Sequence, residues 1–175
     1  MADMYVQASL AFRCTNDEWA LLDEASRASA TLMREEDSEG PSAAFLCAFP
    51  PGNVHDLWSG YRDIFADGDD PDLGADITGR PLFDASESAT GAWPECCDIA
   101  IMGMAGFQPD AIAQLIYPCC KASLALEPVG FEWSFNCTMP RIGAFGGGWC
   151  AIFSNRIEME STSEALNAAL SGDTL

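Results

Sequence analysis

The residue types that could carry chemistry in this sequence form a glycine-rich stretch, a run of aspartates, and a set of cysteines with one histidine. The stretch GAFGGGW, residues 143–149, is the most similar of these to a phosphate-binding loop. Such a loop presents consecutive backbone N–H groups at the start of a helix, usually beside a Lys or Arg. Here the spacing matches neither common glycine pattern, and strand-like residues follow. The stretch therefore predicts a tight connection or bulge where two backbones approach closely.

The aspartate run over residues 67–76 offers carboxylate oxygens, which hard cations such as Ca²⁺ prefer. No register of the run supplies the EF-hand order of ligands, with Gly at the sixth position and Glu at the twelfth. We therefore predict no metal site, and a solvated acidic loop that is available to a protein partner.

The chain contains eight cysteines and a single histidine, His55. Cys–His catalysis needs a base beside the thiol and a third group that orients the base. Asp56 is only the sequence neighbour of His55, which does not supply that geometry. No CxxC spacing of the kind used by structural zinc sites occurs, although the adjacent pairs Cys96-Cys97 and Cys119-Cys120 leave a four-Cys site as a minor alternative. Several cysteines lie in apolar runs, so we expect buried, reduced thiols, no catalytic residue and no cofactor.

Hydrophobic periodicity and capping signals predict the elements that position these residues. A strand is expected over 4–14, and a helix begins at a capping box formed by Thr15 and Glu18. A helix is also expected to begin near Pro109, and a short one after a second box at Ser161 and Glu164. The remaining predictions are a helix over 53–66 and strands over 42–49, 98–107, 121–128, 131–138 and 148–155, the last two as an antiparallel pair.

This pattern predicts an α+β fold built as two strand-and-helix halves with antiparallel sheet, joined by an acidic loop. The N-terminal half covers residues 1–66, the loop rich in Asp, Gly, Pro and Ser covers 67–92, and the C-terminal half covers 93–175. We expect the two halves to form one compact unit.

Composition excludes several classes of protein. The 27 acidic residues against 8 basic ones give a net charge of −19, and Lys121 is the only lysine, so direct binding to nucleic acid is not expected. An apolar fraction of 49% argues against disorder. No uncharged apolar run approaches the about 18 residues of a membrane helix. The start of the chain lacks a basic n-region, which predicts no secretory signal and a cytoplasmic protein.

The segment 131–159 contains an aromatic strand, a cysteine, an arginine and an F-G-G-G sequence before another apolar strand, at Trp133, Phe135, Cys137, Arg141 and Phe145 to Gly148. This pattern resembles a C-terminal motif of small acidic, mostly uncharacterised proteins of bacterial plasmids and phages. Trp149 and Cys150 stand where that pattern commonly has a small residue. The resemblance covers less than a fifth of the chain, and it implies a mobile-element setting in a bacterial host but no particular activity.

The acidic surface is the remaining signal, and its charge matches that of DNA. Duplex DNA carries one charge per roughly 1.7 Å, so 19 net charges correspond to about 32 Å of duplex. A domain of this length is about 40 Å across by the usual size scaling. The sequence therefore predicts an acidic, nucleic-acid-mimicking inhibitor of a bacterial defence protein, of the anti-CRISPR or anti-restriction type, which blocks a basic groove.

The predicted partner is a basic nucleic-acid-binding protein or complex of the host, with Trp58 or Trp93 as aromatic anchors. The alternatives are an accessory interaction protein of a mobile element without mimicry, and a small-molecule-binding protein that uses the glycine-rich segment. The oligomeric state is left open. The acidic residues predicted to contact the partner are Asp17, Glu18, Asp23, Glu24, Glu35, Glu36, Asp37, Glu39, Asp67, Asp69, Asp70, Asp72 and Asp76.

Overall fold

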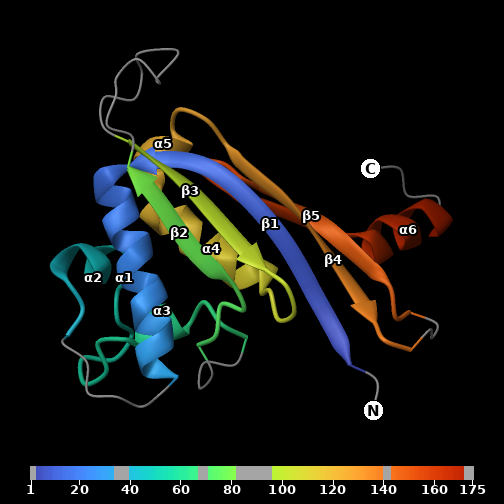
Figure 1. Cartoon of the computed structure of the whole chain (residues 1–175), viewed down its shortest axis with the longest axis horizontal. Coiled ribbons are helices and arrows are strands. Elements are labelled where there is room, and N and C mark those ends of the chain that lie inside the picture. Colours follow the sequence, from blue (N-terminus) through green and yellow to red (C-terminus); the bar gives the residue numbers. More distant parts are fainter. Residues whose placement is uncertain (1–2, 34–39, 67–70, 82–95, 140–142, 172–175) are drawn as a thin grey trace.

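Six strands form one antiparallel sheet in the computed structural model, which describes residues 3–33, 40–66, 71–81, 96–139 and 143–171 (Figure 1). The strand order is β2-β3-β1-β4-β5-β6. In chain order the elements are β1 (Met4–Thr15), α1 (Asn16–Leu32), α2 (Ala43–Ala48), α3 (Ser59–Arg62), β2 (Asp76–Pro81), β3 (Cys96–Gly103), α4 (Pro109–Cys119), α5 (Lys121–Leu124), β4 (Val129–Cys137), β5 (Gly146–Ile152), β6 (Ile157–Ser161) and α6 (Thr162–Ser171). The predicted α+β class is confirmed.

The connectivity shows how the two predicted halves are combined. Strand β1, from the first half, lies between β3 and β4, from the second, so the halves share one sheet. The succession β1-α1-β2-β3-α4-β4 with this strand order is the split β-α-β arrangement called ferredoxin-like, and β5 and β6 extend it. Residues 76–81 of the predicted acidic loop form β2, while 67–70 and 82–92 lie outside the described residues. A fold of this kind does not by itself imply a function.

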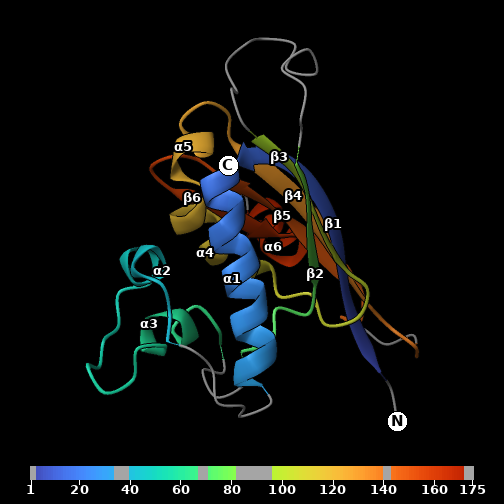
Figure 2. The same ribbon diagram turned by 60° about the vertical axis from the view of Figure 1, so that its left-hand side comes forward.

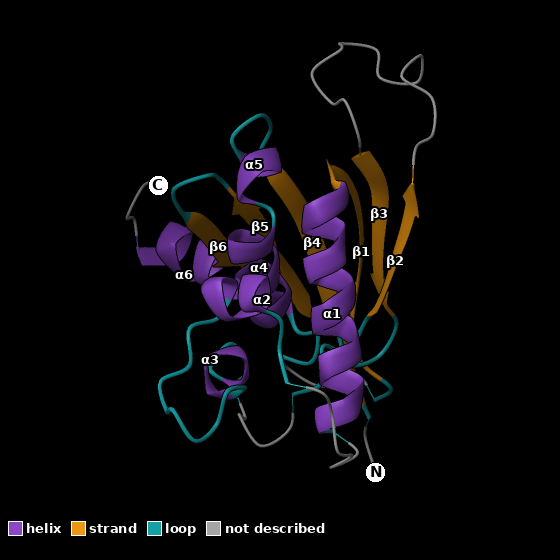
Figure 3. Cartoon of the chain, turned by 90° about the vertical axis from the view of Figure 1, so that its left-hand side faces the viewer, coloured by secondary structure: helices purple, strands orange, loops and turns teal. Residues whose placement is uncertain are grey.

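The helices lie on one side of the sheet, as Figures 2 and 3 show. Helices α1 and α4 supply Leu22 and Ile112 to the core, and β3 supplies Ile101; each of these side chains is fully buried. In the part of the chain that the structure describes, no helix covers the opposite side of the sheet. We call that side the open face.

Local capping signals identified several elements correctly. Thr15 and Glu18 form the predicted capping box of α1, because the Glu18 N–H donates to Thr15 Oγ1 and the Thr15 N–H to Glu18 Oε2. Pro109 begins α4, and the N–H of Glu164 donates to Ser161 Oγ as the second box requires. The predicted antiparallel pair in the C-terminal half is β4 with β5.

Three predictions of secondary structure are wrong. The apolar run 42–49 forms helix α2 instead of a strand, because Ser42 caps it by accepting the N–H of Phe45. A short apolar run has no periodicity that separates a buried strand from a buried helix. Residues 121–128 likewise begin as helix α5, and only Ser59–Arg62 of the predicted helix over 53–66 is helical.

The cysteines are free, and six of the eight are buried. Burial raises the pKa values of Cys119 and Cys150 to about 12. A hydrogen bond with Cys14, together with burial, raises the pKa of Cys120 as well. These thiols are therefore protonated at neutral pH and act as small apolar side chains in the core.

Candidate partner-binding face

The open face is made of alternate residues of the six strands, because successive side chains of a strand point to opposite sides of a sheet. On β3 the buried Ile99 and Ile101 face the helices, and Asp98, Ala100 and Met102 face away from them. The strand register then places on the open face Tyr5, Gln7, Ser9, Ala11, Arg13, Asp76, Thr78, Arg80, Asp98, Ala100, Met102, Glu132, Ser134, Asn136, Trp149, Ala151, Glu158 and Glu160. Small and polar side chains dominate this set, so the face has no apolar stripe of the kind that a packed helix needs.

Trp149 and Met102 are the large apolar side chains of this set that are exposed, at 41% and 50%, and Trp149 is the larger of the two. It lies opposite Glu132 of β4 and opposite Glu160 of β6 in the strand register. Side chains directly opposite one another in antiparallel strands are near neighbours. Among the described residues neither carboxylate has an ion-pair partner. The face therefore presents an aromatic ring between two uncompensated negative charges; we call these three residues the Trp149 row.

The glycines before Trp149 allow β5 to lie against the aromatic side chains of β4. A Cβ atom on Gly148 would lie 2.4 Å from the indole ring of Trp133, and one on Gly146 would lie 2.5 Å from the ring of Phe135. A Cβ on Gly147 would lie 2.2 Å from the carbonyl oxygen of Trp133. The predicted close approach is confirmed, but the predicted tight connection or bulge is wrong for residues 146–149, which pair with β4 in unbroken register. Residues 146–149 of this stretch belong to strand β5, and the side chains of Trp133 and Phe135 occupy the space beside the glycines, so the stretch does not form a phosphate-binding loop. Arg141 lies outside the described residues.

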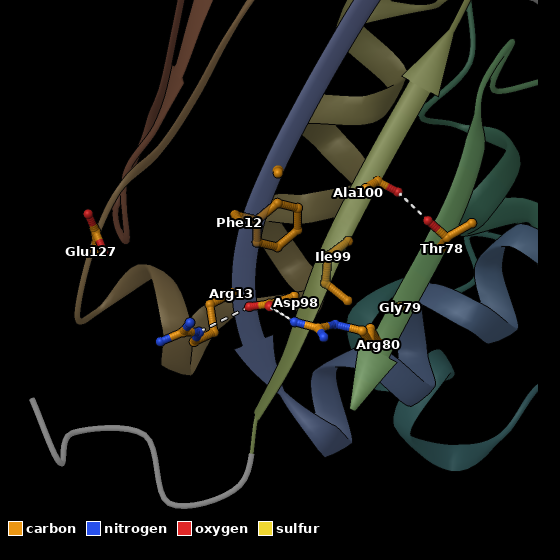
Figure 4. Close-up of a pocket in the computed structure, with 10 residues that line it drawn as sticks. Phe12, Arg13, Thr78, Gly79, Arg80, Asp98, Ile99, Ala100 and Glu127 are labelled. Atoms are coloured by element: carbon orange, nitrogen blue, oxygen red, sulfur yellow. Dashed lines mark hydrogen bonds and ion pairs between the residues drawn. The ribbon is translucent and has the colours of Figure 1, made fainter. Parts of the chain in front are cut away.

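A second group of charges on the open face joins three strands. Arg13 Nε donates to Asp98 Oδ1 at 3.2 Å, and Arg80 Nη2 donates to Asp98 Oδ2 at 3.1 Å. Figure 4 shows Asp98 between the two guanidinium groups, beside a hollow of about 590 Å³. Partial desolvation raises the pKa of Asp98, but the hydrogen bonds and charges of Arg80 and Arg13 outweigh it, so the pKa is lowered overall. The cluster ties β1, β3 and β2 together and carries one net positive charge.

Glu18, predicted as a partner contact, is buried and serves the fold instead. Its carboxylate accepts the N–H groups of Ala122 at 2.7 Å and Ser123 at 3.1 Å, and also the hydroxyl of Ser123. With the N–H of Thr15 added, it satisfies donors from both the start of α1 and helix α5. Sequence reasoning assigned Glu18 to a solvent face because a capping box shows only the local half of these contacts.

The other predicted contact residues are dispersed. Asp23 pairs with Arg27 at 2.8 Å, and Glu24 accepts the N–H and hydroxyl of Ser42, each at 2.7 Å. Asp72 accepts the N–H of Gly74. Of the described candidates, Asp17 and Asp76 are exposed, and Asp76 lies on the open face. The remaining seven lie outside the described residues: Glu35, Glu36, Asp37, Glu39, Asp67, Asp69 and Asp70.

Of the two predicted aromatic anchors, the structure describes only Trp58. Trp58 is half-buried and packs edge-on against Phe45, with ring centroids 5.2 Å apart, so it belongs to an aromatic cluster of the fold. Trp93 lies outside the described residues. Sequence reasoning did not single out Trp149 as an exposed aromatic residue, although its alternation with Cys150 and Ile152 indicated that its side chain points away from the core.

Three further observations concern metal ligation, the single histidine and membrane spans. Within the described ranges no group of three or more His, Cys, Asp and Glu residues is arranged to hold a metal ion. His55 is exposed, and its backbone N–H donates to Asn53 Oδ1. No described helix combines the length and apolar character that crossing a membrane requires.

No family model, no curated protein and no solved structure matches this chain. Its function must therefore be argued from the chemistry of its own surface.

Proposed function

We propose that this protein is an acidic inhibitor that occupies the basic nucleic-acid groove of a bacterial defence protein, and that the open face around Trp149 makes the contact. The single observation that carries the proposal is the Trp149 row, an exposed aromatic ring between the unpaired carboxylates Glu132 and Glu160. Tryptophan is among the residues that dominate binding energy at interfaces. Flanking carboxylates select a partner surface rich in Arg and Lys.

The whole-molecule charge supports the same class of partner. A net charge of −19 attracts a basic groove over a distance and raises the association rate at low salt. Because the carboxylates of the face lie on a hydrogen-bonded sheet, binding does not have to order a flexible chain around them. A nucleic-acid-binding groove is a widespread protein surface with the opposite charge and an elongated shape. In this proposal the protein acts in the cytoplasm of a bacterial host.

The test is a pull-down with the tagged protein from lysate of bacteria that carry active defence systems, at low and at high salt. We expect recovery of a DNA- or RNA-binding complex that weakens at high salt and is displaced by added nucleic acid. Trp149→Ala and Glu132→Lys should each abolish recovery.

Glu158→Gln is the matched control, because Glu158 lies on the same face but is already paired with Arg156 at 2.6 Å. A partner that is indifferent to nucleic acid would contradict inhibition by mimicry and favour an accessory interaction protein of a mobile element. Recovery that survives Trp149→Ala would contradict the assigned contact face.

A further inference from the structure

The sheet opens between its two central strands. Strand β1 pairs with β4 only from Met4 to Ala8, opposite Trp133 to Cys137, whereas it pairs with β3 from Ala8 to Thr15. Beyond Ser9, in the part of the chain that the structure describes, β1 is paired on its β3 side only. Over residues 129–131 strand β4 is likewise paired only with β5. We call the space between these two half-paired segments the split.

The hydrogen-bond alternation shows which backbone groups face the split. The Val6 N–H donates to the Ala105 carbonyl at 2.8 Å, and the Phe107 N–H donates to the Val6 carbonyl at 3.2 Å, so even-numbered residues of β1 direct their backbone groups toward β3. Odd-numbered residues must then direct theirs toward β4, as the bond from the Thr138 N–H to the Asp3 carbonyl confirms.

Ala8 and Trp133 form the last pair of the β1–β4 ladder and do not bond to each other, so Ser9 and Glu132 beside them still supply its closing hydrogen bond. Beyond that bond, Ala11 and Arg13 of β1 and Gly130 of β4 direct their backbone groups toward the split. The N–H and C=O groups of these three residues have no described strand partner on that side. A strand edge in this state is a template for pairing with another chain.

The split is also a hollow of the molecular surface. A space of about 190 Å³ lies between the two margins, lined on one side by Ala11 and Arg13 and on the other by Glu127, Pro128 and Gly130. Ala11, Arg13 and Glu127 also line the larger hollow that continues over the open face beside Asp98. Figure 4 labels both Arg13, on β1, and Glu127, on the segment before β4, among the residues that line the larger hollow. The unpaired backbone groups are therefore accessible from the open face.

The charges along the split are unequal. On the β4 margin Glu127 and Glu132 are exposed, and neither has an ion-pair partner among the described residues. On the β1 margin Arg13 is held by Asp98. The occupant that complements both the backbone groups and these carboxylates is an extended segment with basic side chains.

We propose that the split accepts an extended, basic segment of the partner protein as an added strand, paired with Ala11 and Arg13. This inference rests on the proposed function, because it names how the basic partner engages the open face. Main-chain hydrogen bonds supply affinity in this mode of recognition, and the alternating side chains supply specificity. Glu127 and Glu132 select Lys or Arg at alternate positions of the added strand.

The test uses the purified full-length protein and a capped synthetic peptide, Ac-Lys-Val-Lys-Val-Lys-Val-NH2, whose β-branched residues favour an extended chain. Amide hydrogen exchange is followed by NMR with and without the peptide. We expect the peptide to slow exchange at Ala11 and Arg13 by about tenfold or more, and to leave Leu10 and Phe12 unchanged. Binding without slower exchange at these two amides, or no binding at millimolar peptide, would overturn the proposal.

Substitutions separate strand addition from general attraction to an acidic protein. Ala11→Pro removes only an N–H that faces the split and should weaken peptide binding about fivefold or more. Glu127→Gln should weaken it by a smaller factor, whereas Glu158→Gln, on the same face but away from the split and already paired with Arg156, should not. Equal loss in Glu127→Gln and Glu158→Gln would overturn the site. If Ala11→Pro does not fold, a peptide with N-methylated amides at alternate residues tests the same hydrogen bonds on the unaltered protein, and unchanged binding overturns the site.

The failures of the two proposals are distinguishable. A peptide that protects these amides while no nucleic-acid-handling partner is recovered would retain the strand site and remove the proposed function. Recovery of a nucleic-acid-handling partner, with no protection of these amides by the peptide, would retain the proposed function and remove the strand site. Protection that grows with protein concentration alone would identify a second copy as the occupant, and it would overturn the assignment to a partner.

Discussion

The two faces of the sheet use neighbouring residues of the same strands for opposite purposes. Ile101 is fully buried beneath the helices, whereas the next residue, Met102, is 50% exposed on the open face. On the covered face the buried carboxylate of Glu18 has a donor for each oxygen, but on the open face Glu132 and Glu160 have no ion-pair partner among the described residues. The comparison shows that the covered face supplies the packing that stabilises the fold. The unpaired carboxylates of the open face are therefore available for binding.

The largest expected effect comes from the adjacent pair on β3. Ile101→Ala should lower the free energy of unfolding by about 3–4 kcal/mol, because it leaves a cavity in the core. Met102→Ala should lower it by less than about 0.5 kcal/mol, since that side chain already contacts water. Urea denaturation measures both values. Similar losses in the two variants would show that something covers the open face in solution.

Glu18 provides the next test. Glu18→Ala should cost about 3 kcal/mol, because it leaves the buried N–H groups of Ala122 and Ser123 without an acceptor and removes half of the capping box. Asp17→Ala, on the exposed first turn of the same helix, is the matched control and should cost about 0.5 kcal/mol through the helix dipole. Chemical denaturation of both variants measures the two losses in the free energy of unfolding. A loss in Glu18→Ala no larger than that in Asp17→Ala would contradict the buried role of its carboxylate.

The glycines of β4 and β5 allow a comparison between crowded and open positions. Gly148→Ala should cost about 2 kcal/mol, because the new Cβ would meet the ring of Trp133 and the carbonyl oxygen of Glu160, each at 2.4 Å. Gly130→Ala places its Cβ 3.4 Å from the nearest carbonyl oxygen and should have little effect. Thermal melting of the two variants checks the difference. Equal melting temperatures would contradict the close packing of β5 on Trp133.

The smallest effect is the pH dependence of the Asp98 cluster. The pKa of Asp98 is below its ordinary value of 3.8 in the folded protein, so the cluster contributes stability above that pH and loses the contribution as the pH falls through the lowered pKa. Because the pair is partly exposed, the contribution should be below about 1 kcal/mol. Denaturation of the wild type and of Asp98→Asn should differ at pH 6 and converge near pH 2. A difference that persists in acid would assign it to another cause.

Signals between residues close in sequence predicted the structure well. The capping boxes at Thr15 and Ser161 depend on atoms three residues apart, and Pro109 needs only its own ring to favour a first helical position. Signals that depend on tertiary partners failed. The run 42–49 is a helix whose cap residue, Ser42, also donates its N–H and hydroxyl to the carboxylate of Glu24 from helix α1, a contact that the local pattern does not contain. Trp58 was predicted as a surface anchor, but it packs against Phe45.

The sequence by itself determined the α+β class, the dominant negative charge, and the alternation that separates core from surface along each strand, because these follow from composition and local periodicity. Only the tertiary structure decided which acidic side chains are exposed and without an ion-pair partner among the described residues. It buried Glu18, paired Asp23 with Arg27, and brought Glu132, Trp149 and Glu160 from three strands into one row. Strand order and register set these neighbours, and both depend on contacts between residues far apart in the chain, which local patterns do not contain.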